Sequence, residues 1–239
     1  MTSARPSSPQ GFSGRLQWLG AALVLAAAVA AFQPALLNEP CHDDKTQLDA
    51  WPAPASAAQW LRSAVEPWWP PSHHKNIYRP ATRLTIQFQR LAAPQWTAGL
   101  YGANILFHAL VSLSVLCFAR ALPGWGRGAA LAAALIFALH PMHCEAVHQI
   151  VGRAETLASV AMLAGLTAWM RRQGEWKIQA WAQPLALAAA LSFKEHAVLY
   201  PFYLALAMAA TARAQRPVRW RLNLALLGAL AAVAAAFLA

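Results

Sequence analysis

The chain has 239 residues, of which 58% are hydrophobic and 12% charged, and its net charge is +10. In a soluble domain about a quarter of the residues are charged, and the apolar residues form stripes along amphipathic elements. Here the apolar residues form long blocks, as membrane-crossing helices of roughly 20 residues require. The basic residues lie mainly in short connections between these blocks, which is typical of cytoplasmic loops. The composition therefore excludes a soluble helical bundle and argues against a nucleic-acid-binding protein.

Apolar segments follow one another along the whole chain. We expect them at residues 16–37, 98–121, 128–139, 156–170, 184–193, 197–210 and 222–239. Segments 128–139 and 184–193 are short for a full crossing, so we expect them to be tilted, broken or extended by polar residues at their ends. The predicted fold class is all-α: a polytopic transmembrane helical bundle of about seven membrane segments with a structured first outer loop.

The expected organisation begins with a cytoplasmic N-terminus, residues 1–15, and a first transmembrane helix, residues 16–37. A cleaved signal peptide is the alternative for this helix, because small residues lie near its end. Residues 38–97 are polar and rich in proline and tryptophan, so we expect an outer loop with short helices resting at the interface. Residues 98–239 hold the remaining bundle. Because the sequence stops inside an apolar run, we expect this bundle to be C-terminally incomplete.

The acidic residues divide unequally between the two sides of the membrane. With the N-terminus in the cytoplasm, every short basic loop falls on the cytoplasmic side, as the positive-inside rule requires. Glu175 then lies inside, whereas eight acidic residues lie outside: Glu39, Asp43, Asp44, Asp49, Glu66, Glu145, Glu155 and Glu195. Seven of the eight histidines also lie outside, and His108 falls within the second segment. Ionisable groups near a membrane are costly and tend to mark function, so this pattern predicts a polar site on the outer face.

Two candidate groups lie in the first outer stretch. Asp43 and Asp44 follow the first apolar segment, where a carboxylate can act as a general base on a hydroxyl. The alternative is a solvated turn or a helix cap made by one of the two. Arg79 precedes Pro80, which favours an extended backbone. Its guanidinium suits a phosphate oxyanion, although an interfacial arginine can equally reach toward lipid headgroups.

The string HPMHCEAVHQIVGRAE, residues 140–155, is the most specific in the chain. A proline breaks the third apolar segment, and five candidate side chains follow: His140, His143, Glu145, Arg153 and Glu155. One interpretation is a metal site with imidazole and carboxylate ligands, although the spacing differs from HExxH. A second is a hydrogen-bonding wall for a polar ligand. A third is a structural role in which Arg153 pairs with the neighbouring acids.

Lys194 and Glu195 interrupt an apolar hairpin between two segments. An ion pair at a helix break can be purely structural. The alternative is that Lys194 faces an anionic headgroup or a lipid-linked phosphate. The sequence leaves both interpretations open.

Taken in order, these motifs resemble one family. An aspartate pair after the first segment, YRPAT late in the outer stretch, FALHPMHCEAVHQIVGRAE and SFKEH resemble the transmembrane, tetratricopeptide-containing O-mannosyltransferases and their bacterial relatives. These proteins belong to the GT-C superfamily of membrane glycosyltransferases. The resemblance covers residues 16–210. The chain departs from the eukaryotic members because it carries no tetratricopeptide repeats.

The resemblance implies an inverting glycosyltransferase that moves a sugar, mannose by family expectation, from a polyprenyl-phosphate donor to an acceptor hydroxyl of a protein or glycan. Asp43 or Asp44 is then the base. The donor phosphate and sugar are lined by Arg79, His140, His143, Glu145, Arg153 and Lys194, with Glu155 and Glu195 as further binding residues. The resemblance implies no cofactor, and the metal site considered above stays open as an alternative.

Two further expectations concern the setting of this chemistry. We expect a multi-pass protein of the bacterial inner membrane, or of the endoplasmic reticulum membrane in a eukaryote, with its site facing the periplasm or lumen. Its partners are then the lipid-linked donor, the acceptor and membrane lipids, without nucleic acid. The alternatives are a polytopic transporter and a non-catalytic membrane scaffold.

Overall fold

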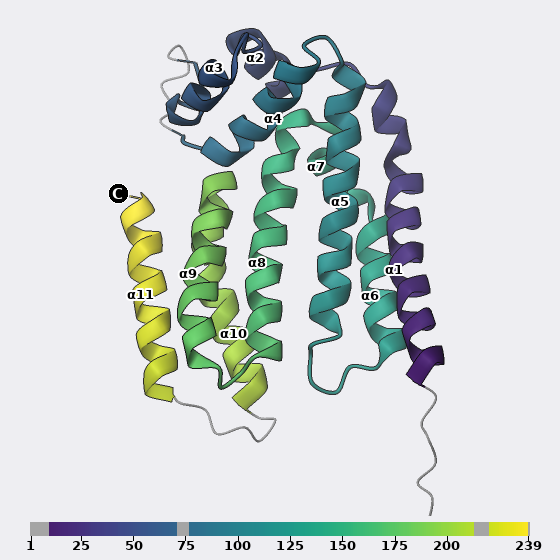
Figure 1. Cartoon of the computed structure of the whole chain (residues 1–239), viewed down its shortest axis with the longest axis vertical. Helices are drawn as coiled ribbons and strands as arrows, with labels where there is room; N and C mark the ends of the chain where they lie inside the picture. Colours follow the sequence, from purple (N-terminus) through teal and green to yellow (C-terminus); the bar gives the residue numbers. More distant parts are fainter. Residues whose placement is uncertain (1–9, 71–76, 213–219, 239) are drawn as a thin grey trace, which may run out of the picture.

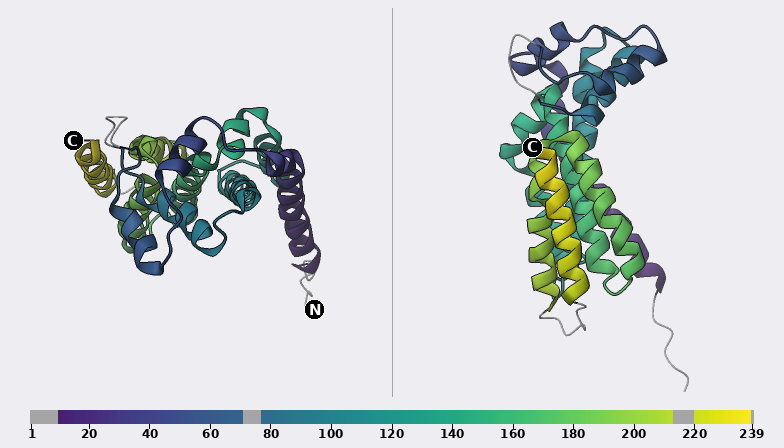
Figure 2. Two further views of the ribbon diagram at one scale, coloured as in Figure 1. Left: turned by 90° about the horizontal axis from the view of Figure 1, so that it is seen from above. Right: turned by 90° about the vertical axis from the view of Figure 1, so that its left-hand side faces the viewer.

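The computed structural model describes residues 10–70, 77–212 and 220–238, and these residues form helices and no strand. The long helices are α1 (Gln10–Phe32), α5 (Thr97–Ala119), α6 (Arg127–Leu139), α8 (Arg153–Arg171), α9 (Trp176–Phe193), α10 (Tyr200–Ala212) and α11 (Trp220–Leu238). They run side by side in one bundle, with α1 and α11 at opposite edges (Figures 1 and 2). The shorter helices are η1 (Gln33–Leu37), α2 (Asp43–Ala50), α3 (Ala57–Arg62), η2 (Ser63–Val65), α4 (Pro80–Ala92), η4 (Pro141–His143), α7 (Cys144–His148), η5 (Ile150–Gly152) and η6 (Glu195–Leu199).

The predicted apolar segments correspond closely to the long helices. The largest difference is α9, which begins at Trp176 rather than near residue 184. Among the described residues, three stretches are long and apolar enough to cross a membrane: Trp18–Leu37, Thr97–Ala119 and Ile150–Arg171. The prediction of an all-α membrane protein is confirmed at this level.

The expected number of about seven membrane segments is not confirmed. A fourth span is added if α6 and the stretch Pro141–His148, which are bent by 48° at their junction, are taken together. This bend agrees with the prediction of a broken third segment, because Pro141 cannot continue the α6 helix. Polar residues through the first half of α9 lower its hydropathy, and α10 has 13 residues.

Helices α2, α3, η2 and α4, hereafter the cap, lie over one end of the bundle (Figures 1 and 2). A buried apolar cluster joins the cap to the bundle and contains Trp51, Trp68, Ile86, Tyr101 and Ile150. The rings of Trp51 and Trp68 pack edge to face with centroids 4.8 Å apart. Such aromatic pairs bury large apolar areas, so the cluster holds the cap in a fixed position over the helix ends.

Gly165 marks a close approach of α8 to its neighbours. A β-carbon there would lie 2.6 Å from the β-carbon of Ala186 and would also collide with the Tyr200 hydroxyl. We expect Gly165→Ala to lower the free energy of unfolding by about 1–3 kcal/mol through overpacking, measured as a fall in Tm in detergent. Gly228→Ala is the matched control, because a β-carbon at Gly228 meets no atom within 4 Å. An equal Tm for the two variants would contradict the packing described here.

Candidate active site

A cavity of about 440 Å³ opens where the cap meets the helix ends. Segments far apart in the sequence contribute to its wall, as the clustering of polar residues predicts. Six of the predicted site residues line it: Asp43, Arg79, His143, Glu145, Glu155 and Lys194. The other four, Asp44, His140, Arg153 and Glu195, do not line it, and each has a contact that explains its position.

The two adjacent aspartates have different surroundings. Asp44 is fully buried and accepts hydrogen bonds from the backbone N–H groups of Ile150 (2.7 Å) and Val151 (2.9 Å) and from the Tyr101 hydroxyl (3.4 Å). Asp43 is exposed and lines the cavity. Burial raises the pKa of the Asp44 carboxyl, although its hydrogen bonds favour the charged form. Asp44 therefore fixes η5 in place, whereas Asp43 is free to contact a ligand.

The turn before this pair has an unusual backbone conformation. His42 has φ 47° and ψ −121°, and it is the one non-glycine residue with positive φ in the part of the chain that the structure describes. Such a conformation costs about 1–3 kcal/mol and persists where the surrounding contacts hold it. Here the hydrogen bonds of Asp44 hold the start of α2, and the turn leaves Asp43 at the cavity.

Arg79 also lines the cavity, and Glu195 holds its side chain. Its backbone has φ −134° and ψ 67°, which is non-helical but differs from the extended conformation that was predicted, and Pro80 begins α4. Its guanidinium donates two hydrogen bonds to the Glu195 carboxylate, the Nε–Oε2 distance being 2.8 Å, and lies over the Trp68 ring. The Glu195 carboxylate therefore orients the Arg79 side chain, of which 11% stays exposed.

Glu195 is ionised in this pair. Burial alone would raise the pKa of its carboxyl, but the hydrogen bond from Arg79, a backbone hydrogen bond and the charges of Arg79 and Lys194 together lower it below the ordinary value. A lowered carboxyl pKa stabilises the fold above the unfolded-state pKa. This contribution is lost as the pH falls through the lowered pKa of Glu195.

Lys194 pairs with Glu155 rather than with its sequence neighbour Glu195. Its Nζ donates to Glu155 Oε1, and Nδ1 of His196 lies 3.1 Å from the other carboxylate oxygen. Lys194 follows the last residue of α9 in an extended conformation, and Glu155 lies in the first turn of α8. The two residues therefore do not pair with each other at the helix break, and each forms an ion pair with a distant segment instead.

Arg153 lies below the cavity, fully buried. Its guanidinium donates to Gln89 Oε1 (2.6 Å), Asn104 Oδ1 (3.1 Å) and the Leu100 carbonyl (3.0 Å). These acceptors belong to α4 and α5, so Arg153 joins the cap to the bundle. The interpretation in which Arg153 pairs with a neighbouring acid is therefore not found, and Arg153, predicted to bind the donor, does not line the cavity.

The two histidines of the HPMH turn also differ. His140 is exposed, and its Nδ1 accepts a hydrogen bond from the Met142 N–H (3.1 Å), so it caps η4. The His143 ring lines the cavity and packs against the rings of Phe137 and His108. Within the described residues no group of three His, Cys, Asp or Glu is arranged to hold a metal ion. His73 and His74 lie outside the described residues.

Comparison with known proteins gives a consistent set of relatives. The chain is 36% identical over 118 residues to protein O-mannosyl-transferase TMTC3 of human and of mouse, which is 49% of this chain and 12% of each relative. It is 31% identical over 157 residues to human protein O-mannosyl-transferase TMTC1, which is 63% of this chain and 18% of that relative. The chain is similar to the TMTC O-mannosyl-transferases over these stretches. The predicted resemblance is thereby confirmed.

The match to the TMTC proteins is limited in extent. The chain spans less than a fifth of the length of these curated relatives. No family model matches the chain, and no solved structure matches it. The roles of individual residues in this chain therefore rest on its own geometry.

Several residues around the cavity were not predicted. Trp69, Ile77, Met142 and Gln149 line the wall, and His196 lies against Glu155. The tryptophan-rich outer stretch and the SFKEH motif were the available signals for Trp69 and His196. Apolar and amide residues such as Ile77 and Gln149 carry no comparable signal in a membrane protein.

Proposed function

We propose that this protein is a GT-C-type glycosyltransferase that moves a sugar, mannose, from a polyprenyl-phosphate donor to an acceptor hydroxyl on the outer side of the membrane. The observation that carries the proposal is the composition of one cavity wall: an exposed carboxylate, Asp43, shares it with two cations, Arg79 and Lys194. A base and a phosphate-binding pair are the groups that such a reaction requires. The similar proteins are named O-mannosyl-transferases, which supports the same class of reaction.

The proposed reaction is a single displacement at the anomeric carbon, with inversion. Asp43 takes the proton of the acceptor hydroxyl, and the hydroxyl oxygen forms the new bond to the anomeric carbon. The bond between that carbon and the phosphate oxygen breaks, and its electron pair leaves on the lipid phosphate. Arg79 and Lys194 stabilise the negative charge that develops there. Each atom of this step is supplied by the donor, the acceptor or a residue of this chain.

The ion pairs seen without ligand fit this role. Arg79 and Lys194 are each held by one carboxylate, Glu195 and Glu155, so both cations are oriented before a donor arrives. Orientation of this kind reduces the reorganisation needed at the moment of reaction. We assign the sugar to the neighbouring wall, where Trp69 offers an apolar ring face and Glu145 and Gln149 offer hydrogen-bonding groups.

Lys194 allows a test of the phosphate assignment. We expect Lys194→Gln to weaken donor binding by about ten-fold to a hundred-fold, because a charged hydrogen bond is worth roughly 1.5–3 kcal/mol. The measurement is the donor KM in lipid vesicles. Lys45→Gln is the matched control, since Lys45 is exposed on the cap and does not line the cavity. Equal effects of the two substitutions would mean that Lys194 acts only through the overall charge.

The function itself is tested by donor choice. The full chain in lipid vesicles is incubated with polyprenyl-phosphate mannose or with GDP-mannose, and release of polyprenyl phosphate or GDP is followed over time. We expect turnover with the lipid-linked donor and none with the nucleotide sugar. Turnover with GDP-mannose would contradict the donor assignment. An absence of turnover with any lipid-linked sugar would instead favour a non-catalytic scaffold.

A further inference from the structure

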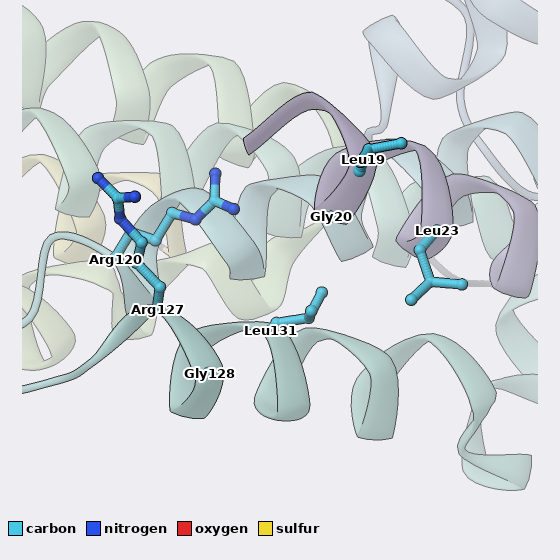
Figure 3. A pocket seen from close by; sticks show the side chains of 7 residues that line it. All are labelled: Leu19, Gly20, Leu23, Arg120, Arg127, Gly128 and Leu131. Carbon is cyan, nitrogen blue, oxygen red and sulfur yellow. The ribbon is translucent and has the colours of Figure 1, made fainter. Parts of the chain in front are cut away.

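A second concave site lies at the other end of the bundle, far from the cap. It is a groove of about 310 Å³ between the middle of α1, the end of α5 and the start of α6. Leu19, Leu23 and Leu131 form its apolar wall, with Gly20 and Gly128 beside them. Figure 3 shows the side chains of Arg120 and Arg127 at one end of this groove and Leu23 toward the other. The groove therefore has a cationic end and an apolar end.

Neither of these arginines is neutralised within the described residues. No ion pair or side-chain hydrogen bond involves Arg120 or Arg127 there, and Nε of Arg120 is buried without a partner. Other arginines at the same end are occupied: Arg171 donates to the Cys117 carbonyl, and Arg172 pairs with Glu175. A buried N–H without an acceptor is costly, so an anionic ligand would complete this site.

The groove is arranged along the direction in which the helices cross a membrane. Arg120 directly follows the span Thr97–Ala119, and Arg127 is the first residue of α6, so both guanidinium groups lie at the polar boundary. Leu23 and Leu131 lie about one helical turn further along α1 and α6. Trp18 and Trp125, 78% and 48% exposed, flank the same level, as tryptophans at a membrane interface do.

We propose that this groove binds an anionic phospholipid of the adjacent leaflet. The phosphodiester lies between Arg120 and Arg127, whose planar guanidinium groups suit phosphate oxygens. The first part of an acyl chain lies along Leu19, Leu23 and Leu131. The charge and the depth of the groove favour this occupant, because phospholipid is the ligand that places a phosphate directly beside an alkyl chain at this level.

Substitution of Gly20 can test whether the groove must be open for a ligand to bind. A β-carbon built there lies 3.4 Å from a terminal nitrogen of Arg120 and 3.7 Å from a methyl carbon of Leu131. A methyl group therefore fits, whereas a larger side chain would project into the space between the arginine and the leucine. Gly20→Leu keeps both positive charges and fills the groove, so it separates a fitted lipid from a general electrostatic attraction.

The test is native mass spectrometry of the full chain in detergent, titrated with dioleoylphosphatidylglycerol, with dioleoylphosphatidylcholine or with glycerol phosphate. We expect one phosphatidylglycerol to remain bound per chain, with a preference over phosphatidylcholine of about thirty-fold, since each of the two arginines near the surface contributes about five-fold. Arg120→Gln/Arg127→Gln should abolish the preference. Arg172→Gln/Lys177→Gln removes the same charge from the same end and should leave it unchanged.

The remaining outcomes decide against the proposal or for it. Loss of the retained lipid in Gly20→Leu, with the Tm and helix content of the wild type, would support a fitted site. Equal loss in both double variants would show attraction by overall charge and overturn the site. Binding of glycerol phosphate as tight as that of the lipid would overturn the acyl-chain assignment. A dimer that persists without added lipid would show that a second copy occupies the groove.

Discussion

Asp43→Asn is expected to reduce the rate of sugar transfer by about 10²–10⁴-fold while the protein remains folded, because general-base catalysis contributes that much. Asparagine has nearly the same shape but cannot accept the proton of an acceptor hydroxyl. Asp43 is exposed and no hydrogen bond or ion pair of its carboxylate is present among the described contacts, so its replacement should change the free energy of unfolding by less than about 0.5 kcal/mol. The measurement is kcat together with Tm on the same preparation.

Asp49→Asn is the matched control for this prediction. Asp49 is also an exposed acid of α2, and it does not line the cavity. The two substitutions remove the same charge from the same helix, so overall electrostatics affects both equally. If Asp43→Asn transfers sugar at the rate of Asp49→Asn, the base assignment is wrong.

Asp44→Ala should act on stability instead. It would leave the N–H groups of Ile150 and Val151 buried without an acceptor, and each such group costs about 1–3 kcal/mol. We therefore expect a loss of roughly 2–6 kcal/mol in the free energy of unfolding, measured as a large fall in Tm in detergent. Tyr101→Phe removes the weaker hydrogen bond of 3.4 Å and should cost much less.

Asp44→Asn separates the two aspartates further. Its amide oxygen can accept one N–H, but the amide NH₂ would face the other backbone donor. We expect a lower Tm, and partial activity at temperatures where this variant remains folded. If Asp44→Asn kept the wild-type Tm and lost all transfer, Asp44 rather than Asp43 would be the base.

The order of the apolar helices could be predicted from the sequence, because long apolar runs leave few alternatives to membrane helices. The residue at which α9 begins could not be predicted in this way. The first half of α9 contains Gln179 and Gln183, which look like loop residues in a hydropathy pattern. In the structure Gln183 donates to the Gly165 carbonyl and accepts from the Tyr200 hydroxyl. Such partners come from other helices, so they are visible only after folding.

The meeting of distant polar segments at one cavity was also predictable, because their side of the membrane followed from charge alone. The different roles of residues adjacent in the sequence could not be predicted. Asp43 and Asp44 are adjacent in sequence, but successive residues of a helix point about 100° apart, so one faces the cavity and the other the protein. Lys194 likewise pairs with Glu155 of α8, whereas Glu195 pairs with Arg79, which precedes α4.

Arg153 shows a further limit of the motif. It belongs to the most specific string in the chain, yet its three hydrogen-bond acceptors are neutral groups of α4 and α5. A sequence pattern records that a residue type is required, and a buried arginine that joins two layers satisfies this requirement as well as one that binds phosphate. The complete burial of Arg153 favours the role in which it joins α8 to α4 and α5.

The central claim is that the cavity under the cap receives a lipid-linked sugar phosphate. The most direct measurement is a cryo-EM structure of the full chain with a non-transferable donor, a polyprenyl phosphonate analogue of the sugar phosphate. We expect the phosphonate oxygens within hydrogen-bond distance of Arg79 or Lys194. We expect the Asp43 carboxylate on the face of the anomeric carbon opposite the phosphonate. Phosphonate density at Arg120 and Arg127, with the cavity under the cap empty, would contradict it.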